Sequence, residues 1–268
     1  MLKDVTLGQF FPGKSLIHRL DPRTKLLILI GYIVALFLAV SWLSYGVVFV
    51  FLVSCIAISR IPVKSFFRGM KPLIFILVFT GILNIFFTQG ETVLVQFWKI
   101  TVTLEGLIRA FFMVFRIMLL ITGTFLLTYT TSPIALTDGL ESLLSPLKKI
   151  KLPVHELSMM MCIALRFIPT LIEETDKIMS AQKARGADFE SGKLMQRVKA
   201  LVPILVPLFI SAFRRADELA TAMECRCYHG GDGRTKMKLL RMRSFDYYSF
   251  LVSAAMIAGV CVLRHFGL

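Results

Sequence analysis

Uncharged stretches divide this sequence into segments long enough to cross a membrane. The stretch from Leu26 to Ser59 contains no formal charge. As one helix it would be about 50 Å long, whereas the hydrocarbon core of a bilayer is about 30 Å thick. We therefore predict two helices joined by a turn around Ser41–Ser44, where Trp42 suits a membrane interface.

Three further apolar stretches predict transmembrane helices over Leu73–Thr88, Gly106–Thr130 and Phe245–Phe266. Residues 1–25 are mixed and charged rather than a basic region followed by an apolar core, so we expect no cleavable signal peptide. The predicted fold class is all-α, a polytopic membrane protein with about five transmembrane helices.

Between residues 131 and 244 the helical pattern becomes amphipathic. Thr131-Ser132-Pro133 begins a helix that Ser145-Pro146 interrupts. Two longer helices, Pro153–Arg185 and Lys193–Arg226, follow it, and each is apolar in its first half and charged in its second half. Their apolar runs are shorter than a typical transmembrane span. We expect tilted helices that leave the membrane and end in water.

The two longer helices end alike. Asp176, Ala181 and Arg185 of the first are matched, at identical spacings, by Asp217, Ala222 and Arg226 of the second. Each arginine lies where a helix gives way to glycine or to a polar turn. The repetition predicts that the protein meets the same kind of partner surface twice.

The chain has a net charge of +14, with 31 Lys and Arg against 17 Asp and Glu. Lys and Arg number five before Leu26, four in residues 60–71, one in the next loop and eighteen in residues 148–243. This alternation indicates membrane topology and not nucleic-acid binding. It predicts that the N-terminus and residues 131–244 are cytoplasmic and that the C-terminus is outside.

The predicted division of the chain has four regions. They are a cytoplasmic N-terminal segment over residues 1–25, transmembrane helices over 26–130, cytoplasmic or interfacial coupling helices over 131–244, and a last transmembrane helix over 245–268.

Two features allow more than one interpretation. Arg116 falls inside a predicted transmembrane helix, where a charge costs about 2.5–3.5 kcal/mol unless it faces protein or water. It belongs either to a substrate pathway or, as we favour in the absence of an intramembrane acid, to a structural hydrogen bond with neighbouring carbonyls. The cluster Met159, Met160 and Met161 is either an adaptable partner surface or ordinary core packing.

The motifs of an enzyme or a cofactor site are weak in this sequence. Gly186–Leu194 has one residue too many between its glycines and Leu where a P-loop needs a hydroxyl, so ATP hydrolysis is expected on another polypeptide. Cys225, Cys227 and His229 lack a fourth ligand at a recognisable spacing. We therefore predict no metal, no cofactor and no catalytic residue, and we expect all five cysteines to be reduced.

Several motifs occur in order along nearly the whole chain: Leu7–Phe10, Ile17–Lys25, Thr131–Pro133, Leu143–Pro146, Leu152–Glu156, Leu165–Pro169, Ala184–Gly186 and Arg214–Glu218. Together they resemble the transmembrane T component of energy-coupling factor transporters. The resemblance implies a prokaryotic cell-membrane scaffold that joins two cytoplasmic ATP-binding-cassette ATPases to a small substrate-binding S component, for uptake of vitamins or transition-metal ions. The N-terminal motif is closest to the version in which several vitamin S components share one T component.

The resemblance also assigns roles to the helix ends. Ala184, Arg185 and Gly186 match the family's Ala-Arg-Gly motif, which ends a coupling helix that docks in an ATPase groove. At the second motif only Arg226 matches, because Cys225 and Cys227 replace Ala and Gly. We therefore expect the arginine contact at Arg226 but not a glycine-type turn after it. By the same resemblance, the methionine cluster is a candidate contact for the S component.

Two other function classes remain open at this stage. A stand-alone secondary transporter or channel would use Arg116 in its pathway and would work without ATPases. A membrane-bound enzyme ranks last, because no cluster of His, Asp or Glu with ligand spacing gathers at a membrane face.

Overall fold

The computed structural model describes residues 10–88, 92–97, 100–187, 189, 194–231 and 240–266. The chain divides into two compact units, which are described separately. The bundle unit comprises residues 8–140 and 240–268, and the helix-pair unit comprises residues 1–7 and 141–239.

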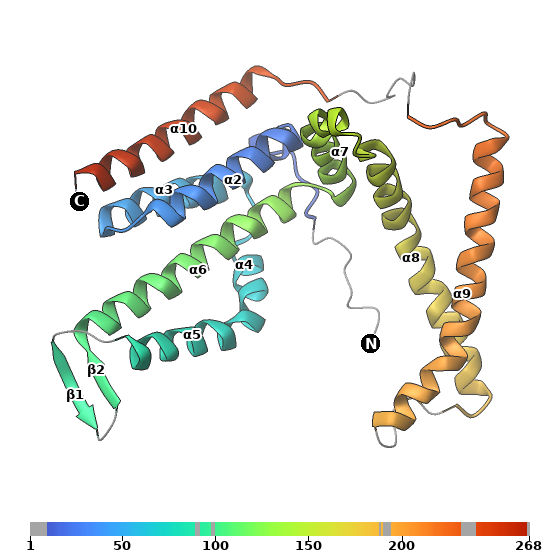
Figure 1. Ribbon diagram of the computed structural model, residues 1–268, viewed down its shortest axis with the longest axis horizontal. Helices are drawn as coiled ribbons and strands as arrows, with labels where there is room; N and C mark the ends of the chain where they lie inside the picture. Colours follow the sequence, from blue (N-terminus) through green and yellow to red (C-terminus); the bar gives the residue numbers. More distant parts are fainter. Residues whose placement is uncertain are drawn as a thin grey trace. The chain divides into compact units, whose positions relative to one another are not determined.

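The bundle unit is built from helices and one short hairpin (Figure 1). Its elements are α1 (Leu16–Arg19), α2 (Pro22–Leu38), α3 (Trp42–Ser59), α4 (Val63–Met70), α5 (Ile74–Phe87), β1 (Val93–Phe97), β2 (Ile100–Thr103), α6 (Leu104–Thr130), most of α7 (Pro133–Leu144) and α10 (Ser244–His265). Helix α10 packs along α2 and α3, and α5 packs along α6.

The predicted division of the first uncharged stretch is confirmed. Helix α2 ends at Leu38 and α3 begins at Trp42, with the Ser41 side chain accepting a hydrogen bond from the backbone N–H of Ser44. The predicted start of α7 is also confirmed, because the Ser132 hydroxyl accepts from the N–H of Ala135. Polar caps therefore mark these helix starts as the sequence indicated.

Two elements were not predicted. The charged connection around residues 60–71 contains helix α4, which a 3₁₀ turn over Lys71–Leu73 joins to α5. Strands β1 and β2 form an antiparallel hairpin between α5 and α6, with Phe97 paired to Ile100. Their alternating β-branched residues favour strands, but strands this short give a weak signal beside long apolar helices.

The core of the bundle unit lies where α2, α3, α6 and α10 meet. Tyr32 of α2 lies against Gly123 of α6, where an added Cβ would come within 2.6 Å of the tyrosine ring. The Tyr32 hydroxyl donates a hydrogen bond to the backbone carbonyl of Leu119 at 2.9 Å. This buried phenol is therefore both packed and satisfied, which fixes the spacing between α2 and α6.

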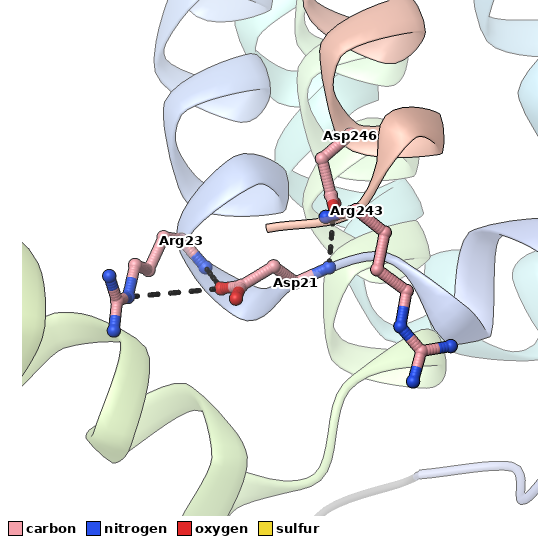
Figure 2. A network of polar contacts seen from close by, with 4 residues as sticks. All are labelled: Asp21, Arg23, Arg243 and Asp246. Carbon is pink, nitrogen blue, oxygen red and sulfur yellow. Dashed lines mark hydrogen bonds and ion pairs between the residues drawn. The ribbon is translucent and has the colours of Figure 1, made fainter. Parts of the chain in front are cut away.

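A buried polar cluster ties the start of α2 to the start of α10 (Figure 2). The Asp246 carboxylate accepts hydrogen bonds from the backbone N–H groups of Asp21, at 2.9 Å, and Arg243, at 2.7 Å. Asp21 in turn caps α2 by accepting from the N–H of Arg23. Nearby, the Lys25 ammonium donates to the carbonyl of Thr130 and to the hydroxyl of Thr131. The two ends of the bundle sequence are thereby locked together.

Five helical stretches in the described part of the chain are long and apolar enough to cross a membrane: α3, Val63–Phe87, α6, α8 (Val154–Ala184) and α10. Five is also the predicted number of transmembrane helices, but this set contains α8, which was not predicted as a span, and lacks α2, which was. The sequence-based statement that the apolar run of α8 is too short is wrong by this measure. Helix α2, with 17 residues, is about 25 Å long and lies at the lower limit for a span.

The helix-pair unit consists mainly of α8 and α9 (Leu194–Glu224), preceded by a 3₁₀ segment over Ser145–Ile150. The Glu174 carboxylate pairs with the Arg215 guanidinium at 2.6 Å, and the Gln182 amide donates to the carbonyl of Pro203. Because the α8 contact closer to its C-terminus meets an earlier position of α9, the two helices run antiparallel. Figure 1 shows them crossing.

Candidate functional site

The end of α8 forms a complete glycine-type cap around Arg185. The helix ends at Ala184, and the backbone N–H of Arg185 donates to the carbonyls of Ala181 and Gln182. Gly186 follows with a φ of 87°, and its N–H donates to the carbonyl of Lys183 while that of Ala187 donates to the carbonyl of Gln182. These are the two hydrogen bonds of a Schellman motif, with the arginine as the last half-helical residue.

The end of α9 repeats this geometry around Arg226. The N–H of Cys227 donates to the carbonyl of Glu224 at 2.8 Å, and the N–H of Tyr228 donates to that of Met223 at 3.0 Å. Cys227 has a φ of 55°, in the left-handed region that Gly186 occupies in the first motif. The expectation that no glycine-type turn follows Arg226 is therefore wrong, because Cys227 adopts that conformation without being glycine.

Both arginine side chains are accessible to a partner. Ala184, Arg185 and Gly186 are exposed, as are Cys225, Arg226 and Cys227. Within the residues that the structure describes, neither guanidinium forms an ion pair. A guanidinium presents a planar fork of donors that suits a carboxylate or a set of carbonyls.

The supporting residues of the two helices also repeat. The Ser180 hydroxyl donates to the carbonyl of Asp176, and at the equivalent position of α9 the Thr221 hydroxyl donates to that of Asp217. Ala181 and Ala222, the next residue in each helix, are both exposed. The sequence repeat is therefore a repeat of local structure.

The ion pair between Glu174 and Arg215 joins equivalent positions of this repeat, because the interval between these two residues equals the interval between Arg185 and Arg226. Each terminal arginine is thus about 16 Å beyond this ion pair on its own helix. Because the helices are antiparallel, their C-terminal ends, which Arg185 and Arg226 follow, lie at opposite ends of the pair, as the ends of α8 and α9 do in Figure 1. Sequence reasoning missed this contact, although opposite charges at the repeat spacing were available as a signal.

The methionine cluster lies near the N-terminal end of α8. Met160 and Met161 are exposed, and Met159 is half-buried. The start of α8 is held by Glu141 at the end of α7, whose carboxylate contacts the His155 ring and accepts from the Ser158 hydroxyl, both at 3.1 Å. The exposed methionines therefore project from an anchored helix end.

Arg116 is held by its neighbours inside the bundle unit. Its guanidinium donates to the Tyr45 hydroxyl at 2.7 Å and to the carbonyl of Ala39 at 2.9 Å. It also lies over the rings of Phe37 and Tyr45, with 5.8 and 5.6 Å to their centres. These contacts satisfy an intramembrane charge with hydrogen bonds and cation–π interactions. They are the geometry that a structural role requires.

Some sequence features lie outside the described residues. The start of the Leu7–Phe10 motif, most of Gly186–Leu194 and residues 232–239, which begin the last basic segment, are among them. Cys225 and Cys227 are free thiols. In the described part of the chain, no group of three or more His, Cys, Asp or Glu lies close enough to hold a metal ion.

Comparison with known proteins identifies the family. The family described as cobalt transport protein matches residues 13–237. The curated energy-coupling factor transporter transmembrane protein EcfT of Clostridium kluyveri is 56% identical over 98% of this chain and 96% of its own length. Proteins of the same name from Thermosediminibacter oceani and Bacillus subtilis are 53% and 49% identical, over 98% and 97% of this chain and 99% and 98% of their own. The chain belongs to this family of transmembrane components of energy-coupling factor transporters.

Membership of the energy-coupling factor transporter family confirms the resemblance carried by the ordered motifs. A membrane subunit of a transporter follows from it, and the alternative of a stand-alone transporter or channel is not favoured. The matched region includes both arginine helix ends and the ion pair between their helices.

Proposed function

We propose that this chain is the scaffold and energy-coupling subunit of an ATP-driven importer. In this proposal it links two cytoplasmic ATP-binding-cassette ATPases to a substrate-binding S component for uptake of vitamins or other micronutrients. The chain itself is non-catalytic, and ATP hydrolysis takes place on the partner ATPases. The S component selects the solute.

The observation that supports this role is the duplicated helix end. Arg185 and Arg226 are exposed, occupy the same position in the same type of helix cap and lie at opposite ends of an antiparallel helix pair. Two matched cationic helix ends at opposite ends of the pair suit two related partners better than one. Each guanidinium would enter a groove that offers a carboxylate or backbone carbonyls.

The exposed methionines are proposed to face the S component. Met160 and Met161 have 59% and 40% of their surface exposed, and a flexible thioether repacks against different partners at low cost. ATP-driven closure of the two ATPases would move the helix ends at Arg185 and Arg226 relative to each other. The apolar first halves of α8 and α9 would carry that motion to the S component.

The proposed orientation places the N-terminus and residues 131–244 in the cytoplasm and the C-terminus outside. It rests on the eighteen Lys and Arg in residues 148–243 and on the charged second halves of α8 and α9. In this orientation α2 crosses the membrane and α8 lies at its cytoplasmic surface, so the start of α2 and the end of α3 lie on the cytoplasmic side together with the start of α10.

Charge reversal at both helix ends tests the proposal. The variant Arg185→Glu/Arg226→Glu is expected to lose co-purification with the two ATPases and vitamin uptake through a co-expressed S component. The matched control is Lys177→Glu/Arg214→Glu, which reverses two exposed charges on the same helices away from their ends. The control is expected to retain both assembly and uptake.

Retained assembly and uptake in the Arg185→Glu/Arg226→Glu variant would overturn the proposal. Equal loss in the control variant would also contradict it, because the effect would then follow total charge and not the helix ends. Solute transport by the purified chain alone in liposomes would instead support a stand-alone transporter.

A further inference from the structure

An apolar cavity of about 400 Å³ opens in the bundle unit at the end where α2 begins. Five helices contribute to its wall, through Leu16 of α1, Tyr32 of α2, Phe51 and Cys55 of α3, Leu126 of α6 and Val252 of α10. Its size falls in the range of sites that enclose small ligands. The lining favours a hydrocarbon chain.

A second cavity, of about 790 Å³, lies between residues 11–19 and residues 57–62. Lys14, Arg19 and Arg60 line it, and none of its described lining residues is Asp or Glu. Within the described residues, none of these three cations forms an ion pair. An anion here would compensate a positive charge that this part of the protein leaves unpaired.

The wall of the second cavity is held in place by His18. Its two ring nitrogens contact the Ser15 hydroxyl at 2.7 Å and the carbonyl of Phe11 at 2.9 Å. Gly13 lies so close that an added Cβ would be 2.8 Å from the ring. Burial lowers the pKa of His18, so the ring is neutral at pH 7 and the positive charge comes from the lysine and the two arginines.

The two cavities adjoin, because Leu16 and Ile58 line both of them. Arg60 directly follows α3, one of the helices suited to cross a membrane, so the cationic cavity lies at the level of lipid headgroups. The apolar cavity runs from there toward the helix interiors. A ligand that fills both needs an anionic head and an apolar tail.

We propose that the two cavities together bind one anionic phospholipid. Its phosphate lies among Lys14, Arg19 and Arg60, and one acyl chain enters the cavity beside Tyr32 and Cys55. A free anion would leave the apolar cavity unfilled, and a zwitterionic lipid would bring a cationic group of its own beside the three cations. The site does not depend on the proposed coupling role of the helix-pair unit.

Lipid binding to the purified full-length chain in detergent tests this site. The probes are phosphatidylglycerol, phosphatidylcholine with the same acyl chains, and inorganic phosphate, with bound lipid counted by native mass spectrometry. The Lys14→Gln/Arg19→Gln/Arg60→Gln variant is expected to bind phosphatidylglycerol at least about tenfold more weakly than the unmodified chain. The matched control Lys64→Gln/Arg68→Gln/Lys71→Gln removes three exposed cations from neighbouring positions and is expected to bind within about twofold of the unmodified chain.

The acyl-chain half has its own test. Cys55→Trp would fill the apolar cavity and is expected to weaken phosphatidylglycerol binding, whereas Ser54→Trp, at an exposed neighbouring position, is expected to leave it unchanged. Equal affinity for the two lipids, equal loss in the two triple variants, or full displacement of lipid by millimolar phosphate would overturn the proposal. Unchanged binding by a folded Cys55→Trp chain would overturn the placement of the acyl chain.

Discussion

Cys227 has a backbone conformation that residues other than glycine rarely adopt, and the cap of α9 depends on it. Its φ of 55° costs roughly 1–2 kcal/mol relative to a right-handed conformation. Gly186 provides the equivalent turn after α8 without this penalty, and nothing lies within 4 Å of where its Cβ would be. The two caps therefore differ in strain and not in shape.

Hydrogen exchange of the capping amides measures this difference. Gly186→Ala is expected to raise the hydrogen-exchange rate around Ala187 about fivefold. Alanine in the left-handed conformation costs about 1 kcal/mol, and no neighbouring atom adds a steric cost. Cys227→Gly is expected to slow exchange around Tyr228 by a similar factor. Cys225→Ala, which changes a thiol outside the left-handed position, serves as the control and should leave exchange unchanged. Equal exchange in all variants would contradict the assigned strain.

Lys25 is the residue on which the junction of α2, α6 and α7 depends. Its buried ammonium donates to the carbonyl of Thr130 at 2.9 Å and to the hydroxyl of Thr131 at 3.1 Å. Lys25→Met would leave both acceptors buried without a donor. We expect a loss of about 2–3 kcal/mol of stability, seen as a lower thermal unfolding temperature of the purified chain. Lys64→Met, at an exposed position of α4, is the control and should leave that temperature unchanged.

At the scale of elements, the sequence predicted the long helices well and their contacts poorly. Uncharged length located α2, α3, α6 and α10, and a capping residue followed by proline located the start of α7, because these signals lie close together in sequence. The hairpin of β1 and β2 was missed, since its strands are short and lack a strong turn signal. The Asp246 link to Asp21 joins residues 225 apart, a separation that no local pattern reports.

The contact between α8 and α9 can be tested by exchanging its charges. Glu174→Arg places two arginines together and is expected to destabilise the helix pair by about 1 kcal/mol, as is Arg215→Glu. The double variant Glu174→Arg/Arg215→Glu restores opposite charges and should recover most of the loss in a thermal unfolding assay. Glu173→Arg, at the exposed neighbouring residue, controls for net charge. Additive losses in the double variant would argue against the pairing.

At the scale of the whole molecule, the structure separates a bundle unit from a helix-pair unit, whereas the sequence treated residues 131–244 as one region. The boundary falls inside α7, whose amphipathic pattern is continuous, so no change of composition marks it. The arginine sites were found from the sequence because they repeat. Their placement at opposite ends was not, because it follows from the antiparallel crossing of α8 and α9.

The proposed orientation predicts which side of the membrane can reach Cys225 and Cys227. Both thiols are exposed, so a chain retaining only these two cysteines should react with a membrane-impermeant maleimide in inside-out vesicles. The same chain should stay unlabelled in right-side-out vesicles until detergent is added. Labelling in intact right-side-out vesicles would reverse the orientation proposed for residues 131–244.

The Glu174–Arg215 ion pair is a candidate pivot between α8 and α9. Arg185 and Arg226 are equally far from it along their helices, so equal displacements of the two helix ends rotate α8 and α9 by equal angles. From the ion pair, α8 extends about 30 Å back to Val154 and about 16 Å forward to Arg185. If α8 rotates about the ion pair as a rigid rod, its N-terminal end at Val154 moves almost twice as far as Arg185. Pro169 lies within the longer of these two segments and marks the position where α8 would bend.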